Sequence, residues 1–221
     1  TIVTTETIKS IADQNGFKMY DCYTGFKWIA AVIRDNEGVG RYLGGGEESY
    51  GFLAEDFCRD KDAVSAISLM AEALAWAKTK GMNFLQMLQD IYIKYGYSRE
   101  AGVSLVRKGK SGAEEIIAIM KEFRANPPKQ IAGSDVVIVK DYADLNMKNL
   151  KTGEVTKMDM PTTSNVLQYF TEDGTKISIR PSGTEPKIKF YVEVKGSMKT
   201  NADYADANNK ADAKIEAVKK D

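Results

Sequence analysis

The sequence predicts a mixed α/β protein of two domains: an α/β/α layered domain over residues 1–96, then a small α+β domain over residues 97–221. In the first part, short extended patterns alternate with helical ones, an order typical of a parallel α/β layer. The second part has one helical pattern, four strand patterns, two of them of period 2, and a final helical pattern, which predict a four-stranded antiparallel sheet with helices. A length of 221 residues is sufficient for two such cores.

The composition is that of an ordinary globular protein, and it narrows the possible functions. Hydrophobic residues make up 43% and charged residues 28% of the chain, and 31 basic residues balance 31 acidic ones. A net charge of zero gives no electrostatic support for nucleic acid or a membrane surface as a partner, so any anion is expected to bind at a local, shaped site. The absence of histidine removes Ser-His and Cys-His nucleophile pairs and histidine metal sites.

Three features bear on cellular context. No apolar run reaches membrane-spanning length and no charged-then-apolar leader opens the chain, which predicts a cytoplasmic protein. Cys22 and Cys58 are isolated and each lies beside large apolar or aromatic residues, so two reduced thiols are favoured over a disulfide. Because the chain starts without methionine, directly in an apolar run, we expect the carboxy-terminal part of a longer protein.

Two helices are expected in the first forty residues, one ending at Asn15-Gly16 and one over residues 26–34. Thr4 or Thr5 is expected to cap the first of them. The strands expected before and between these helices, and after the second, are residues 1–3, 17–23 and 41–43.

Two longer helical patterns follow, over residues 63–78 and 84–95, the second capped by Asn83. The first has a broad apolar face, typical of a helix that packs on a sheet. This face consists of Val64, Ile67, Leu69, Met70, Leu74 and Ala75, and the residues of the second helix expected to be buried are Leu85, Leu88, Ile91 and Tyr92.

The second part begins with an extended segment, residues 97–107. Ser111-Gly-Ala-Glu114 predicts a capping box for a helix over residues 113–125. The strands expected next are residues 136–139, 166–170, 177–179 and 188–194, followed by a helix over residues 201–220. The polar, turn-rich residues 147–161 predict a surface excursion.

A glycine-rich segment, Gly44-Gly-Gly-Glu-Glu-Ser-Tyr-Gly51, directly follows the third expected strand. Glycines at the carboxyl end of a parallel strand are where α/β proteins place ligands. They let a ligand lie close, and Glu47, Glu48 and Ser49 offer acceptors and a hydroxyl suited to a sugar. The alternative is a flexible turn with two solvated carboxylates.

Arg180-Pro-Ser-Gly-Thr-Glu-Pro-Lys187 lies between two period-2 strands, and its composition suits an anion. Gly183 frees the backbone to turn its N–H groups inward, and Ser182 and Thr184 add hydroxyl donors. Arg180 adds a planar fork that matches phosphate or carboxylate. The alternative is a solvated hairpin turn that contains an arginine by chance.

Four segments resemble the α-D-phosphohexomutases, the family that contains phosphoglucomutase and phosphomannomutase. Residues 180–187 resemble the phosphate-binding loop of that family's fourth domain. Thr24-Gly-Phe-Lys-Trp-Ile29, Gly46-Glu-Glu-Ser-Tyr-Gly51 and Arg59-Asp-Lys-Asp62 resemble the Thr-Gly-x-Lys segment of its third domain, the sugar-binding loop and the charged segment after that loop. Their order fits as well, so the resemblance covers nearly the whole chain.

The resemblance implies a phosphosugar mutase that interconverts a hexose 1-phosphate and a hexose 6-phosphate, glucose before mannose, through a bisphosphate intermediate. The family's first two domains hold the nucleophilic phosphoserine and an Asp-x-Asp-x-Asp site for Mg²⁺, and neither motif is present in this chain. The chain is therefore expected to be the substrate-binding half, inactive alone and with no metal ligands of its own. Its expected partners are a phosphosugar, the N-terminal domains of the same polypeptide with their Mg²⁺, and a glucose 1,6-bisphosphate-type activator.

The resemblance also assigns residues of the first domain. Glu47 and Ser49 match positions that hydrogen-bond sugar hydroxyls, whereas Glu48 between them faces elsewhere. Lys27 and Lys61 match lysines of the catalytic cleft, which stabilise charge on the moving phosphoryl group or assist proton transfer.

In the second domain, Arg180, Ser182, Gly183 and Thr184 match residues that hold the phosphate that is not transferred, and Lys187 adds charge at the edge of that site. Two alternatives stay open. The protein is a phosphopentomutase-like member of the family, or it is a sugar-phosphate-binding module without catalysis.

Overall fold

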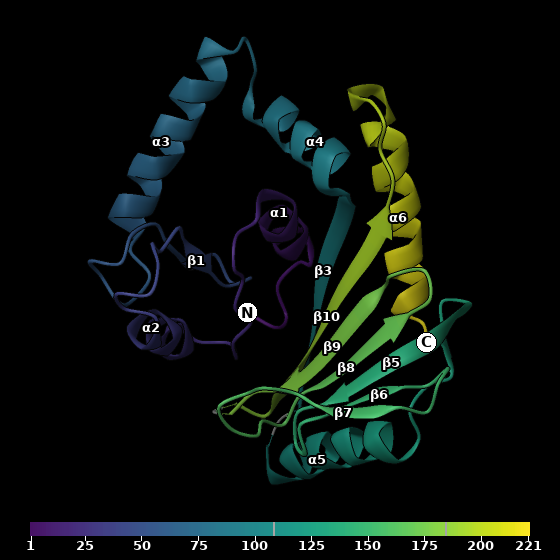
Figure 1. Cartoon of the computed structure of the whole chain (residues 1–221). Helices are drawn as coiled ribbons and strands as arrows, with labels where there is room; N and C mark the ends of the chain where they lie inside the picture. Colours follow the sequence, from purple (N-terminus) through teal and green to yellow (C-terminus); the bar gives the residue numbers. More distant parts are fainter. Residues whose placement is uncertain (108, 184) are drawn as a thin grey trace. The chain divides into compact units, whose positions relative to one another are not determined.

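The computed structural model describes residues 1–107, 109–183 and 185–221 (Figure 1). The chain divides into two compact units. The first unit comprises Thr1–Tyr97 and Ser197–Tyr204, and the second comprises Ser98–Gly196 and Ala205–Asp221. The predicted mixed α/β class with an antiparallel sheet is confirmed.

The first unit is largely helical. Its elements are α1 (Thr7–Asn15), α2 (Phe26–Asp35), β1 (Gly45–Gly46), β2 (Phe52–Leu53), α3 (Ala63–Thr79), α4 (Phe84–Tyr95) and the short 3₁₀ helix η1 (Asn201–Asp203). A small core lies between α2 and the β1–β2 pair and contains Cys22, Phe26, Ile29, Ile33 and Leu53. Both cysteines are free thiols, as expected.

The strands predicted at residues 1–3, 17–23 and 41–43 are wrong. Ile2 and Val3 are buried as the apolar pattern indicates, but they lie in a turn. One backbone hydrogen bond, from the Ile2 amide to the Cys22 carbonyl (2.9 Å), joins the first two segments. A strand needs a repeated ladder of such bonds, so apolar burial is present here without a sheet. The two-residue strands β1 and β2 instead pair antiparallel.

The predicted burial of the α3 face is also wrong. Val64 is 75% exposed, Ile67 69% and Met70 53%, and Ala77 is the buried residue of this helix. Leu85 and Leu88 of α4 are exposed as well. An apolar stripe predicts that a helix face favours burial, but its burial depends on a neighbour that the stripe does not specify.

Helix ends were predicted with mixed success. Asn83 forms a capping box with Gln86, and Gly16 ends α1 in a left-handed conformation, both as expected. The N-cap of α1 is Glu6, one residue beyond the predicted cap Thr5. The predicted capping box at Ser111 is wrong, because α5 begins two residues earlier, at Gly109.

The second unit is built on an antiparallel sheet that has eight strands over the described residues. The order is β3-β10-β9-β8-β5-β6-β7, and β4 pairs with β5 at the side. The elements are β3 (Tyr97–Val106), α5 (Gly109–Ala125), β4 (Gln130–Ile131), β5 (Ser134–Asp141), β6 (Asn146–Asn149), β7 (Val155–Lys157), β8 (Leu167–Thr171), β9 (Lys176–Pro181), β10 (Lys187–Gly196) and α6 (Tyr204–Val218).

The four predicted strands are β5, β8, β9 and β10, and they are neighbours in the sheet. The sheet is larger than the predicted four strands, because β3 adds to β10 and β6 and β7 extend it beyond β5. The predicted surface excursion at residues 147–161 contains most of the β6–β7 hairpin, in which Met147 pairs with Thr156. Most side chains on these two strands are polar, so the sequence lacks the apolar alternation that would predict them.

The two faces of the sheet differ in chemistry because side chains alternate along each strand. One face is apolar, and α5 packs on it: the Phe123 ring lies 6.4 Å from Tyr169 and 6.2 Å from Phe190, between centroids. Helix α6 lies on the same side, since Arg99 pairs there with Asp212 of α6 (2.9 Å). The opposite, polar face carries Lys176, Ser178 and Arg180 of β9 and Lys189, Tyr191 and Glu193 of β10.

Candidate functional site

The glycine-rich segment forms a tight turn between β1 and β2. The pairs Gly45–Leu53 and Gly46–Phe52 set the register, and the Glu47 amide donates to the Gly51 carbonyl (2.9 Å) to close the turn. A side chain at Gly45 would meet the Tyr42 hydroxyl at 2.7 Å, and one at Gly46 would meet the Phe52 ring at 3.2 Å. Packing within the chain therefore favours glycine at these positions, whatever ligand approaches them.

Gly51 links the turn to the predicted charged residues. A Cβ atom at this position would lie 2.5 Å from the Phe26 ring and 3.0 Å from the Glu47 carboxylate. The Lys61 ammonium lies 5.3 Å from the centroid of the same Phe26 ring. Glu47 and Lys61, fourteen positions apart in sequence, therefore both lie in the neighbourhood of Phe26.

The other predicted residues of this unit lie around that group. Ser49 is exposed at the turn. The Lys27 ammonium lies over Trp28, 5.1 Å from its ring centroid, rather than over Phe26. Glu48 faces elsewhere, as expected: its Oε2 accepts a hydrogen bond from the Thr1 hydroxyl (3.1 Å).

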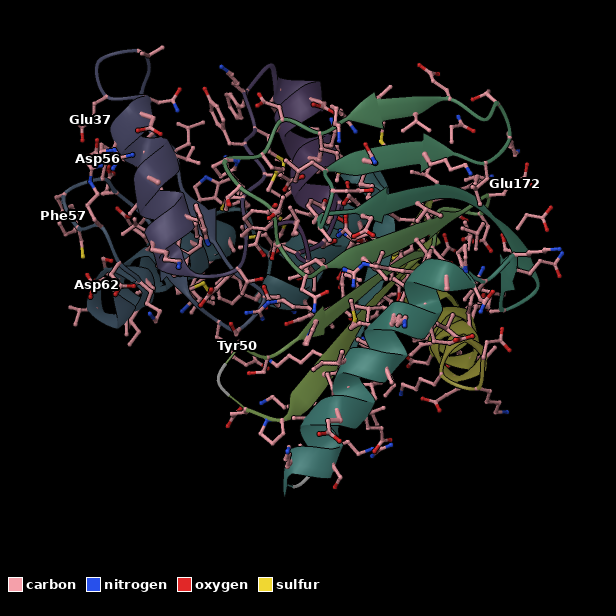
Figure 2. The ribbon with its side chains drawn as sticks, turned by 90° about the horizontal axis from the view of Figure 1, so that it is seen from below. Glu37, Tyr50, Asp56, Phe57, Asp62 and Glu172 are labelled. Atoms are coloured by element: carbon pink, nitrogen blue, oxygen red, sulfur yellow. The ribbon has the colours of Figure 1, made fainter. Side chains whose placement is uncertain are left out.

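The segment after the turn fixes Lys61. Asp62, which Figure 2 labels, caps α3 by accepting hydrogen bonds from the amides of Val64 and Ser65. Hydrogen bonding with the Ser65 side chain, and then with these two amides, lowers the pKa of Asp62. The Asp60 carboxylate pairs with Lys61 (3.0 Å), and hydrogen bonding to Lys61 lowers the pKa of Asp60. Lys61 is therefore tied to the start of a helix, with its ammonium toward Phe26.

We predict that Gly51→Ala destabilises the first unit. The added methyl group overlaps Phe26 and Glu47, and such overpacking costs about 1–3 kcal/mol in the free energy of unfolding. Urea unfolding followed by tryptophan fluorescence measures it, because both tryptophans, Trp28 and Trp76, belong to this unit. The matched control is Gly40→Ala, whose new methyl group meets no atom within 4 Å. An unchanged midpoint for Gly51→Ala would contradict the close packing.

In the second unit, the predicted phosphate loop is the hairpin between β9 and β10. The Ser182 amide donates to the Lys187 carbonyl (2.7 Å), the Lys187 amide to the Glu185 carbonyl (2.7 Å), and the Glu185 amide to the Ser182 hydroxyl (3.3 Å). The Arg107 amide holds the hairpin from outside through the Pro186 carbonyl (2.9 Å). The described residues on the two sides of position 184 thus form a hydrogen-bonded hairpin, which agrees in part with the turn alternative.

The register of this hairpin places Arg180 directly opposite Lys189 on the polar face. Like charges at directly opposed positions destabilise a sheet by their repulsion. An anion bound between them replaces this repulsion with attraction to both cations. Sequence reasoning missed Lys189, because its position matters only once the pairing is known. The sequence does show that Lys189 lies two residues after Lys187, and residues two apart in a strand lie on the same face of the sheet.

The other residues predicted to form the phosphate site are Gly183, Thr184 and Lys187. At Gly183 a Cβ atom would meet no atom within 4 Å and φ is not left-handed, so the chain's own packing does not demand glycine there. Lys187 forms an ion pair with Glu185 (2.9 Å), which lowers the pKa of Glu185 and offsets the charge of the lysine. Thr184 lies outside the described residues.

Within residues 1–107, 109–183 and 185–221, no three Asp, Glu, His or Cys side chains gather as a metal site would require. None of the helices in these ranges has both the length and the apolar character needed to cross a bilayer.

Family models match most of the chain. Residues 1–95 match the model described as phosphoglucomutase/phosphomannomutase, alpha/beta/alpha domain III, and residues 136–211 match the C-terminal domain of the same family. The chain belongs to the phosphoglucomutase/phosphomannomutase family. The resemblance drawn from the loops is thereby confirmed, and the description of domain III agrees with the predicted α/β/α layering.

Similar proteins agree with this family. Phosphoglucomutases of Staphylococcus aureus strains RF122 and N315 are 38% and 39% identical over 194 and 201 residues. These matches cover 88% of this chain and 35% of each relative, so the chain spans about a third of the relatives' length. The open form of pp63/parafusin from Paramecium, described as a phosphoglucomutase, superposes with a TM-score of 0.59 at 20% identity. That match covers 98% of this chain and 36% of the other, and it supports the fold.

Proposed function

We propose that the chain is the substrate-binding half of a phosphosugar mutase that interconverts hexose 1-phosphate and hexose 6-phosphate. The observation that carries the proposal is the Arg180–Lys189 pair, two cations on opposed strands beside the Ser182–Gly183 turn. A phosphate between them removes their repulsion and accepts the two parallel N–H donors of the arginine. The similarity to phosphoglucomutases supports a sugar phosphate as the anion.

In this proposal the Arg180 loop binds the phosphate that stays on the sugar. Gly183 leaves room for a phosphate oxygen to approach the backbone, and the Ser182 hydroxyl lies at the same turn. We also assign the backbone and hydroxyl of Thr184 to this site. Lys187 contributes less than Lys189, because Glu185 neutralises part of its charge.

The first unit binds the sugar hydroxyls. The Glu47 carboxylate accepts hydrogen bonds from them, and the Ser49 hydroxyl donates and accepts. Lys61, whose ammonium lies over Phe26, stabilises negative charge on the transferred phosphoryl group. Lys27, which follows Phe26 in sequence, is assigned the same kind of role at the edge of the site.

We further propose that residues 1–96 and 97–221 correspond to the family's third and fourth domains. The phosphoserine and the Mg²⁺ site then belong to the part of the longer relatives that this chain does not span. The described residues do not form a cluster that fits Mg²⁺, so we assign no step of the reaction to a metal in this chain. A glucose 1,6-bisphosphate-type activator would bind where the substrate binds.

The proposal is tested by assaying the whole protein, meaning the natural polypeptide that contains this sequence. Glucose 1-phosphate, mannose 1-phosphate and ribose 1-phosphate are compared by kcat/KM, with glucose 1-phosphate expected to be highest. A preference for ribose 1-phosphate would support the phosphopentomutase-like alternative. Binding without turnover for all three would indicate a binding module.

We predict that the 221-residue chain alone has no mutase activity, because the family's nucleophilic serine motif is not in its sequence. Circular dichroism establishes that the preparation is folded, and a coupled assay for glucose 6-phosphate measures turnover. The whole protein at equal concentration is the positive control. Turnover by the folded chain would refute the division of roles proposed here.

A further inference from the structure

Tyr50 combines two unfavourable features at the turn between β1 and β2 (Figure 2). Its φ of 66° lies in the left-handed region, where a bulky side chain crowds its own backbone. Its side chain is also fully exposed, with 103% of the reference area accessible to water. An aromatic ring usually gains stability through burial, and this ring gains none within the chain.

The turn cannot relax this conformation easily. The hydrogen bond from the Glu47 amide to the Gly51 carbonyl closes the turn, and the pairing of β1 with β2 holds the two ends of the turn together. Gly51, directly after Tyr50, is buried against Phe26 and the Glu47 side chain. The backbone at Tyr50 is therefore fixed, while its ring projects into solvent.

Other strained positions do not share this pattern. Among the described residues, the non-glycine residues with positive φ are Tyr50, Ala132 and Leu145. Ala132 and Leu145 lie in turns of the second unit and are partly buried. Strained residues that persist without a packing gain cluster at ligand-binding sites, which directs attention to Tyr50.

We propose that the Tyr50 ring contacts the carbon face of the substrate's sugar. This inference rests on the proposed function and adds a residue to the sugar end of that site. Glu47 and Ser49, on the same turn, bind hydroxyls, and a flat aromatic surface supplies the apolar contact that sugar C–H groups need. Because the backbone of the turn is already fixed, binding of the sugar orders the side chain alone and not the loop that carries it.

The test uses three variants of the whole protein. Tyr50→Asn and Tyr50→Gly tolerate a left-handed backbone but lack the ring, and Tyr50→Phe keeps the ring without the hydroxyl. We expect Asn and Gly to raise the KM for glucose 1-phosphate about tenfold, whereas Phe stays within about twofold of wild type. Inhibition by inorganic phosphate, which is assigned to the Arg180 loop, is expected to be unchanged in all three. The urea midpoint is not expected to fall for Asn or Gly, since both relieve strain.

Three outcomes would overturn the inference, and they differ in what they imply for the proposed function. A wild-type KM in Tyr50→Asn, with normal turnover of glucose 1-phosphate, would overturn the role of Tyr50 and leave the proposed function intact. Equal losses for glucose 1-phosphate and inorganic phosphate, with a lower urea midpoint, would show that the ring supports the fold, which also overturns the inference. A wild-type protein that neither binds nor converts glucose 1-phosphate would overturn both the inference and the proposed function.

Discussion

Arg180→Ala in the whole protein is expected to weaken binding of glucose 1-phosphate by more than tenfold while the fold survives. The guanidinium supplies the two parallel donors for phosphate, and a charge-assisted hydrogen bond contributes about 1.5–3 kcal/mol. The side chain lies at the end of β9, half-buried, opposite another cation. Its removal therefore takes away repulsion from Lys189 and is expected to leave the hydrogen-exchange protection of the β9 and β10 amides unchanged or slightly raised.

Two variants control this measurement. Arg180→Lys keeps the charge but loses the planar fork, so it is expected to recover part of the affinity. Lys148→Ala removes an exposed charge from β6, away from the β9–β10 hairpin, and is expected to change nothing. Substrate KM and the inhibition constant of inorganic phosphate are measured for each. Unchanged kinetics for Arg180→Ala would remove the basis of the phosphate site.

The sequence was most informative where a residue's role depends on neighbours along the chain. The Asn83 capping box and the Gly16 stop follow from local hydrogen bonding, and both are present. Strands β9 and β10 were predicted from alternation because apolar side chains line one of their faces, which is buried. The Arg180 loop was found in the same way, as a turn between two alternating runs.

The failures concern partners that are distant in sequence. Residues 17–23 look like a strand because they are apolar in part, yet a strand requires a neighbouring strand to bond with. Lys189 was missed because its importance comes from facing Arg180, which depends on the register of the hairpin. The contact of Lys61 with Phe26, likewise, joins α2 to the segment before α3 and has no local signal.

A buried charge network on the polar face carries the largest expected effect on stability. Glu193 lies 3.3 Å from the Lys176 ammonium and 2.6 Å from the Lys195 ammonium, and it accepts a hydrogen bond from Ser98 (2.6 Å). The side chains of Lys176 and Glu193 are 2% and 3% exposed. Two cations share one carboxylate here, so the network depends on Glu193.

Glu193→Gln is therefore expected to lower the free energy of unfolding of the second unit by about 3–5 kcal/mol, because the buried Lys176 loses its carboxylate. Both tryptophans lie in the first unit, so hydrogen exchange of the β9 and β10 amides is the appropriate measurement. Glu172→Gln is the matched control: it breaks an exposed pair with Lys151 at the surface (Figure 2) and is expected to cost less than about 1 kcal/mol.

The same network predicts how stability responds to acid. Burial acts to raise the pKa of Glu193, but the charge of Lys176 and the hydrogen bonds from Lys195 and Ser98 outweigh it and hold the pKa below its usual value of 4.5. The folded state therefore binds fewer protons than the unfolded state at this residue, so its contribution is full above about pH 4.5 and is lost as the pH falls through the folded pKa. The wild type is expected to lose protection of β9 and β10 in acid, and Glu193→Gln, already destabilised, is expected to lose less. Parallel acid profiles for the two proteins would show that Glu193 does not control this stability.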